Sequence, residues 1–243
     1  MIDVTALAID YGRGDRAVRA VEGIDFELED GRSLALIGPS GCGKTSILFA
    51  LAGLLSPSAG TITLGGKPVI APRREVALIL QNAGLLPWKT VWQNANLSLL
   101  LSGEYRSKNA GAILEDLGLG EVKPRFPAEL SAGMKRRVAI TRALSTSPSV
   151  LLMDEPLASL DTLTRERIQD LFLTLWAKHR FSLVLVTHDI EEAAFLGQEI
   201  LVLTERPARI KAIVANPEMG SVEFRECEAF QETVHALREA LER

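Results

Sequence analysis

The chain has 243 residues, of which 47% are hydrophobic and 24% are charged, and its formal net charge at pH 7 is −4. This length and composition are typical of one large globular domain with a sizeable core. The slightly acidic balance gives no general basic surface of the kind that binds nucleic acid. Two cysteines are too few for a disulfide framework, which fits a reducing compartment. The first residues show no signal-peptide pattern, and the apolar runs are too short to span a membrane.

The N-terminal part of the sequence predicts antiparallel strands. Residues 2–10 and 20–29 alternate apolar and polar side chains, as strands with one face in water do. Residues 61–64 followed by Gly65-Gly66 predict a further hairpin. We therefore expect an antiparallel β subdomain in this part of the chain.

Residues 38–46, Gly-Pro-Ser-Gly-Cys-Gly-Lys-Thr-Ser, carry the most specific pattern. They fit G-x-x-x-x-G-K-[ST], the phosphate-binding loop, and stand between a predicted strand at 33–37 and a predicted helix at 47–52, the context that the motif requires. Such a loop directs backbone N–H groups and a helix N-terminus at phosphate. We expect Lys44 to reach the β- and γ-phosphates and Thr45 to ligate Mg²⁺. The predicted nucleotide contacts are Gly38, Pro39, Ser40, Gly41, Cys42, Gly43, Lys44, Thr45 and Ser46.

Cys42 has two interpretations. Its position beside Lys44 and a helix N-terminus favours a thiolate, which would react with a maleimide unless MgATP shielded it. The alternative is a buried and inert thiol.

The middle of the chain changes character. Helical periodicity dominates residues 83–146, whereas strands are predicted before this segment at 76–80 and after it at 150–153. A helix at about 162–178 leads to a strand at 183–186, as in parallel βαβ units. Two closing strands and an amphipathic helix are predicted at 200–203, 209–214 and 225–241. The predicted fold class is α/β: one domain over 1–243, with a core of about 1–82 and 147–243 and a helical insertion of about 83–146.

The strand at 150–153 ends in two carboxylates, Asp154 and Glu155. In phosphate-loop ATPases an Asp at this place helps to hold Mg²⁺. Glu155 is placed to orient or deprotonate an attacking water, which is the role of a general base. The alternative is an acidic turn in solvent, and the presence of the phosphate loop favours the catalytic interpretation.

With these motifs in place, the chain resembles the ATP-binding subunit of an ABC transporter over nearly its full length. Leu130-Ser131-Ala132-Gly133-Met134 is similar to the signature motif, usually Leu-Ser-Gly-Gly-Gln, and Ala158-Ser159-Leu160-Asp161 is similar to the D-loop. Gln81 resembles the Q-loop glutamine, His188 the switch histidine and Tyr11 the aromatic residue that stacks on adenine.

The resemblance implies a phosphate-loop NTPase core, with ATP and Mg²⁺ as cofactors. It implies a homodimer that forms on ATP binding, in which each nucleotide meets the phosphate loop of one copy and the signature residues Ser131, Ala132, Gly133 and Met134 of the other. It also implies catalytic roles for Gln81, Glu155 and His188, Mg²⁺ contacts for Thr45, Gln81 and Asp154, and a D-loop role for Asp161.

Two residues depart from the family pattern. Ala132 replaces the usual first glycine of the signature, and a Cβ there is tolerable if the backbone φ is negative. Arg136 stands where many members have Gln, within the basic cluster 135–137. Both departures are expected to bear on the affinity of the signature for nucleotide.

Residues 84–88 and 187–193 look most like the nitrate/sulfonate/taurine importer group, and the short C-terminal part would lack an added regulatory domain. The implied function is hydrolysis of MgATP to drive solute uptake through separate permease subunits. The chain would lie on the cytoplasmic side of the membrane as a peripheral subunit, with an extracytoplasmic solute-binding protein as an indirect partner and no nucleic acid. The helical segment would receive a short permease helix, with Trp88 as an interface anchor or, alternatively, as core packing together with Trp92.

Two other functions are alternatives to transport. A soluble ABC ATPase of DNA repair or translation needs a long coiled coil, tandem ATPase domains or a basic surface, and the sequence indicates none of these. A nucleotide-binding regulator without hydrolysis is disfavoured because Glu155 and His188 are both present.

Overall fold

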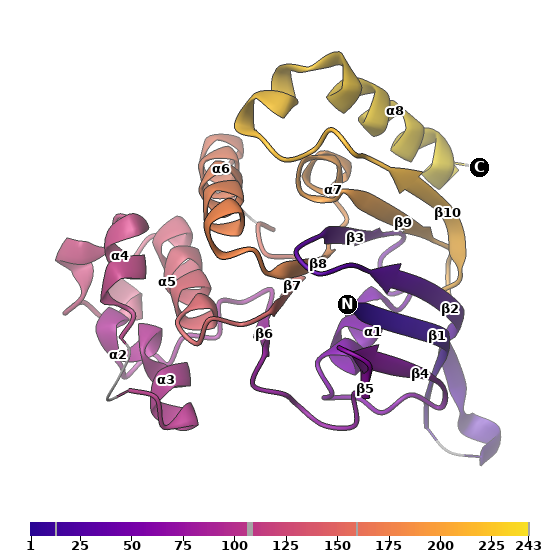
Figure 1. The fold of residues 1–243 in the computed structure, drawn as a ribbon, viewed down its shortest axis with the longest axis horizontal. Helices are drawn as coiled ribbons and strands as arrows, with labels where there is room; N and C mark the ends of the chain where they lie inside the picture. Colours follow the sequence, from indigo (N-terminus) through magenta and orange to yellow (C-terminus); the bar gives the residue numbers. More distant parts are fainter. Residues whose placement is uncertain (13, 106–108, 159, 243) are drawn as a thin grey trace. The chain divides into compact units, whose positions relative to one another are not determined.

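The structure is a computed structural model that describes residues 1–12, 14–105, 109–158 and 160–242. The chain forms two compact units. The first contains residues 1–73 and 180–243, and the second contains residues 74–179. The predicted helical insertion of 83–146 lies wholly inside the second unit (Figure 1).

An antiparallel sheet opens the first unit. Strand β1 (Ile2–Tyr11) pairs with β2 (Val18–Leu28) on one side and with β4 (Ala59–Leu64) on the other, and β5 (Lys67–Pro68) adds to β4 across the Gly65-Gly66 turn. Alternate side chains of β2 are buried, because one face of the sheet packs on the core. The predicted β subdomain and its second hairpin are confirmed.

The first unit also contains a mostly parallel group of strands. Strand β3 (Ser33–Ile37) pairs in parallel with β8 (Ser182–Val186) and β9 (Glu199–Leu203), and β10 (Ile210–Ala215) pairs antiparallel with β9. Every residue of β3 and β8 is buried. Strands covered on both faces require continuous apolar runs, which explains why the sequence signal was strong here.

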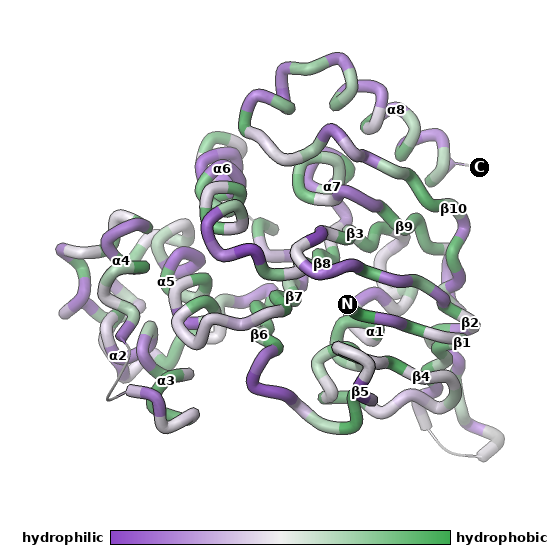
Figure 2. The backbone as a smooth tube through the Cα atoms, viewed as in Figure 1, coloured by the Kyte–Doolittle hydropathy of each residue, from purple (hydrophilic) through white to green (hydrophobic). Residues whose placement is uncertain are grey.

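Three helices of the first unit cover these strands. Helix α7 lies against β3 and α8, and α8 lies along β10. Figure 2 shows alternating hydrophilic and hydrophobic residues along α8, whose side chains at Phe230, Val234 and Leu237 are buried. The predicted helix of 225–241 begins later, because residues 222–226 form a 3₁₀ turn. The α-helices of this unit are α1 (Lys44–Leu51), α7 (Ile190–Leu196) and α8 (Glu228–Glu242), and its 3₁₀ helices are η1 (Gly14–Arg16) and η4 (Val222–Glu226).

The second unit combines a pair of strands with a group of helices. Strand β6 (Val76–Ile79) pairs in parallel with β7 (Val150–Asp154), and all five residues of β7 are buried. Helix α5 is central, since it packs on α2, α3, α4 and α6. The helical elements are α2 (Val91–Ala95), α3 (Leu97–Ser102), α4 (Gly111–Asp116), η2 (Gly120–Val122), η3 (Pro127–Glu129), α5 (Ala132–Leu144) and α6 (Thr162–His179). Among the residues that the structure describes, every helix is too short or too polar to cross a membrane.

Candidate functional site

The predicted phosphate loop connects β3 to α1, as the motif requires. Gly43 has φ 133, and a Cβ on it would lie 2.8 Å from the carbonyl oxygen of Ala20. Gly41 has φ 73. Both positions therefore call for glycine, one because of a close backbone approach and both because L side chains rarely adopt such φ values. Helix α1 begins directly after Gly43, so its free N–H groups open onto the loop.

Lys44 is buried within this loop, with 5% of its surface exposed. Its ammonium group donates to the carbonyl oxygens of Gly38, at 2.8 Å, and Pro39, at 2.9 Å. A buried cation needs hydrogen-bond acceptors, and the loop backbone supplies them. The side chain is therefore held among the loop residues that are predicted to contact phosphate.

Tyr11 and Ser46 were predicted separately, and the structure brings them together. The Tyr11 hydroxyl lies 2.9 Å from Ser46 Oγ, so the end of β1 is tied to the first turn of α1. Tyr11 is 41% exposed, which leaves the side chain available for stacking on a ligand ring.

Cys42 is 1% exposed, and its Sγ lies 4.0 Å from the Lys44 ammonium. A maleimide needs access to the sulfur, so the structure favours the buried, inert thiol over the reactive thiolate. Burial was not visible in the sequence, because a Gly-rich loop reads as exposed.

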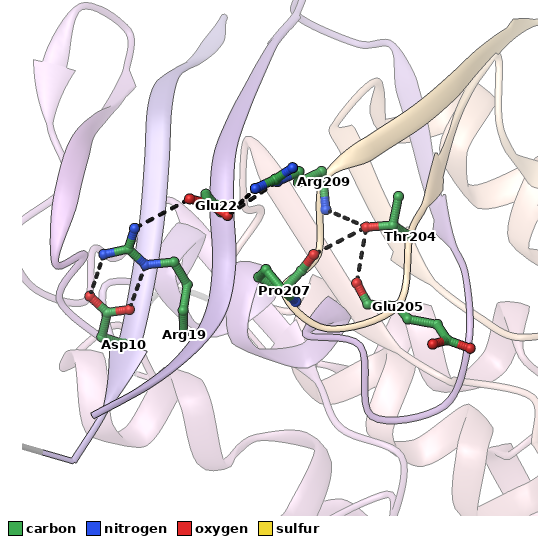
Figure 3. Close-up of polar contacts among 7 residues, drawn as sticks. All are labelled: Asp10, Arg19, Glu22, Thr204, Glu205, Pro207 and Arg209. Carbon is green, nitrogen blue, oxygen red and sulfur yellow. Dashed lines mark hydrogen bonds and ion pairs between the residues drawn. The ribbon is translucent and has the colours of Figure 1, made fainter. Parts of the chain in front are cut away.

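A chain of charged side chains braces the strand that ends in Tyr11 (Figure 3). Arg19 donates two hydrogen bonds to the Asp10 carboxylate, at 2.9 and 3.2 Å, and a longer one to Glu22. Arg209 donates to the other Glu22 oxygen at 2.6 Å. The hydrogen bond from Arg19 lowers the pKa of Asp10, and that from Arg209 lowers the pKa of Glu22. The sequence analysis did not predict this network. The feature that could have indicated it is the register of β1 and β2, which places Asp10 opposite Arg19.

His188 lies between β8 and α7 and is exposed. Thr187 before it is buried, and its hydroxyl donates to the buried Glu192 and accepts from the N–H of Asp189. The Asp189 side chain in turn caps α7 by accepting from the N–H of Glu192. The predicted switch histidine therefore stands on a turn that is fixed on both sides.

In the second unit, the ends of β6 and β7 bring three predicted residues together. Ile79 pairs with Met153, so Gln81 and Asp154 follow neighbouring strands. The Gln81 side-chain amide donates to Glu155 Oε2 at 2.8 Å. Asp154 is buried, and Glu155 has φ 44, a left-handed conformation that is uncommon outside glycine.

The signature residues begin helix α5. Ser131 Oγ accepts from the N–H of Met134 at 3.2 Å, which confirms the predicted N-cap. Ala132 is the first helical residue and is exposed, and the negative φ of a helix accepts its Cβ. Gly133 is buried, and a Cβ on it would lie 2.9 Å from the Thr164 methyl group of α6. The second glycine of the signature is therefore the one at which an added side chain would meet α6.

Arg136 reaches the backbone that follows β6. Its guanidinium donates to the carbonyl oxygens of Leu80, at 2.9 Å, and Gln81, at 2.6 Å. Arg142, further along α5, donates to Ala83 at 2.8 Å and Gly84 at 2.7 Å. The structure thus adds a contact with the backbone at Gln81, while the expected effect of Arg136 on the affinity of the signature for nucleotide stays a prediction. Burial lowers the pKa of Arg142.

The D-loop is described in part, since Ser159 lies outside the described residues. Asp161 Oδ1 accepts from the N–H of Thr164 at 3.0 Å, at the start of α6, and this hydrogen bond lowers the pKa of Asp161.

A hollow of about 410 Å³ joins this segment to the signature and the Q-loop. It is lined by Gln81, Asn82, Ala83, Ala132, Lys135, Arg136, Ala158 and Leu160.

The two tryptophans near Gln81 differ in environment. Trp88 is 69% exposed, so it is not core packing. Trp92 is half-buried, where its ring N–H donates to the Tyr105 hydroxyl and the Lys123 ammonium lies 5.9 Å from the centre of the ring.

Three features define an ATPase of the ABC class. They are a strand followed by a phosphate loop and a helix, a second strand whose end carries Asp-Glu, and a capped signature helix. The sequence matches the ABC transporter family over residues 21–158, and the chain belongs to this family. The resemblance to an ATP-binding subunit of the nitrate/sulfonate/taurine importer group, the ATPase activity and the α/β phosphate-loop fold are confirmed.

Individual relatives support this placement. The chain is 41% identical to the taurine import ATP-binding protein TauB of Yersinia pestis bv. Antiqua (strain Antiqua), over 86% of this chain and 82% of the relative. It is 43% identical to TauB of Rhizobium johnstonii, over 84% and 78%. Among solved structures, cbiO1 from Clostridium perfringens, part of the ABC transporter complex cbiONQ, gives a TM-score of 0.79 at 25% identity, over 98% of this chain and 96% of that one. The dimeric post-hydrolysis state of the ATP-binding cassette MJ0796 bound to ADP and Pi gives 0.74 at 26% identity, over 86% and 98%.

Proposed function

We propose that the chain hydrolyses MgATP in a two-site dimer and thereby drives uptake of a nitrate-, sulfonate- or taurine-like solute through separate permease subunits. The observation that carries the proposal is the hydrogen bond from Gln81 to Glu155, directly beside Asp154. A general base must be oriented towards the water that it activates, and the amide provides that orientation.

Each of the predicted site residues has a separate role in the proposed reaction. Lys44 and the loop N–H groups hold the β- and γ-phosphates, as a helix N-terminus does for anions. Glu155 accepts the proton of a water that attacks the γ-phosphate, and ADP leaves. His188, exposed on its fixed turn, donates a hydrogen bond to the γ-phosphate. Tyr11 stacks on adenine.

The residues that are predicted to contact Mg²⁺ have side chains that suit this ion. Thr45, Gln81 and Asp154 offer a hydroxyl, an amide and a carboxylate oxygen, the hard ligands that Mg²⁺ prefers. Mg²⁺ is ordinarily bound by one or two carboxylates together with substrate phosphates, which matches a single buried Asp154. When bound, the ion neutralises charge on the phosphates.

The second copy is proposed to complete each site. The MJ0796 cassette bound to ADP and Pi is dimeric. In this chain, the first turn of α5 carries the partial positive charge of a helix N-terminus at Ser131, Ala132, Gly133 and Met134. These residues would contact the γ-phosphate held by the partner copy, with Asp161 and the D-loop beside them.

The permease is proposed to dock beside Gln81. Trp88 follows this residue closely and presents a large apolar surface, as interface anchors do. Such docking would hold the chain at the cytoplasmic face of the membrane, and an extracytoplasmic binding protein would deliver the solute to the permease. Similarity to import subunits favours this reading over a soluble ATPase of DNA repair or translation.

Reconstitution tests the proposal. The chain would be purified with its permease, placed in proteoliposomes with the binding protein, and given labelled taurine, an alkanesulfonate or nitrate. We expect uptake of one of these solutes only with MgATP. Uptake without ATP would contradict the proposal, as would an ATPase that ignores the permease but is stimulated by DNA or ribosomes.

A further inference from the structure

Arg136 forms an unusual contact for a residue in the middle of a helix. It is 5% exposed, and its two terminal nitrogens donate to two successive carbonyl oxygens, those of Leu80 and Gln81. A planar guanidinium with fixed N–H directions fixes the orientation of such a pair of acceptors better than a single ammonium or amide does. The backbone on which Gln81 stands is therefore clamped to α5.

The contact continues to a carboxylate. The side-chain amide of the same Gln81 donates to Glu155 at 2.8 Å. A continuous path thus runs from the helix that carries the signature residues, through the backbone and side chain of Gln81, to the carboxylate at the end of β7. Each link lies between residues of the second unit.

We propose that Arg136 is a positioning residue for hydrolysis: it fixes Gln81 so that the Gln81 amide holds Glu155 in the orientation of a general base. This inference rests on the proposed function of Glu155. Without the guanidinium, the carbonyl oxygens of Leu80 and Gln81 lose their charged donor, and the backbone at Gln81 gains freedom. The Gln81 side-chain amide then no longer holds the Glu155 carboxylate in its orientation. A displacement of about 1 Å in a catalytic group can cost about a hundredfold in rate.

Helix α5 also provides a matched control. Arg142 has the same charge and makes the same kind of two-carbonyl contact, but with Ala83 and Gly84, beyond Gln81. A purely structural role would make Arg136 and Arg142 equivalent. A positioning role makes only Arg136 matter for turnover.

The first experiment compares Arg136→Met with Arg142→Met in steady-state ATP hydrolysis and in thermal melts. We expect kcat to fall about tenfold or more in Arg136→Met, with KM for ATP changed by less than about threefold, because the substrate contacts remain while the base is misaligned. Arg142→Met should keep kcat within about threefold. Equal kcat values in the two variants would overturn the proposal. If Arg136→Met does not fold, Arg136→Lys, which keeps the charge but loses the fork, gives the same comparison.

The second experiment tests the path. In a Gln81→Ala background, adding Arg136→Met should change kcat by less than about twofold, because residues that act through one another are not additive. A full, multiplicative loss would show that Arg136 acts by another route. Glu155→Gln, assayed in parallel, separates the two claims. Normal turnover in that variant would remove the general base itself, whereas lost turnover with additive Arg136 and Gln81 effects would overturn only the positioning role.

Discussion

Trp88 and Trp92 show how burial separates function from packing among neighbouring residues of one type. Trp88 is 69% exposed, whereas Trp92 is half-buried between Tyr105 and Lys123. An exposed tryptophan gains little stability from its position and offers a large surface to a partner. The sequence alone could not distinguish them, because each has an apolar residue before it and polar residues after it.

Trp88→Ala should therefore abolish or strongly reduce ATP-driven transport in the reconstituted complex while leaving the melting temperature of the isolated subunit unchanged. Trp92→Ala is the matched control, and it should lower the free energy of unfolding by roughly 2 kcal/mol or more, since a half-buried aromatic ring is lost. A large drop in melting temperature for Trp88→Ala, or full transport by this variant, would contradict the docking role.

At the scale of elements, the contact between α5 and α6 explains why this chain has a glycine at 133 but accepts an alanine at 132. Ala132 is exposed at the first position of α5, while Gly133 lies under the Thr164 methyl group of α6. Close approach of two helices needs a small residue where their surfaces meet. Packing against α6 therefore constrains this position of the signature.

Gly133→Ala should destabilise the folded chain by about 1 kcal/mol, because overpacking costs roughly 1–3 kcal/mol and outweighs the helical gain of Ala over Gly, at most about 1 kcal/mol. Thr164→Ser removes the methyl group that the new Cβ meets, so the double variant should recover most of the loss. Denaturant unfolding measures both. A double variant as unstable as Gly133→Ala alone would rule out this contact as the cause.

The elements also show which parts of the structure were predictable from the sequence. Alternation in residues 2–10, the apolar run at 33–37 and the phosphate loop are short-range patterns, and the structure bears them out. The last helix was placed too early, because residues 222–226 form a 3₁₀ turn that buries Phe224 against Phe230, with ring centres 5.7 Å apart. A turn of this kind has the same local pattern as the first turn of a helix.

Long-range contacts were not predictable. The partners of Arg136 and Arg142 are backbone carbonyls, which any sequence offers, so no residue pattern indicates these contacts. The network of Asp10, Arg19 and Glu22 depends on strand register, which irregularities in the pairing of β1 and β2 shift. For the candidate site, local motifs indicate which residues to expect, and their roles stay predictions, whereas the contacts that hold these residues in place could not be predicted.

For the whole molecule, we expect the hydrolytic site to control how long the ATP-bound dimer persists. Glu155 is its centre, since Gln81 holds it and Asp154 precedes it. If hydrolysis separates the two copies, then a chain that binds ATP but cannot hydrolyse it should remain dimeric. This links a chemical step to a change in assembly that can be measured directly.

The decisive measurement is therefore ATP turnover of Glu155→Gln, with nucleotide binding and molecular mass measured on the same sample and Glu121→Gln, an exposed carboxylate, as the control. We expect turnover to fall by roughly a hundredfold or more, as for loss of a general base, while ATP binding persists and an ATP-bound dimer accumulates. Glu121→Gln should behave as the unaltered chain does. Near-normal turnover in Glu155→Gln, or a monomer at saturating ATP, would contradict the account.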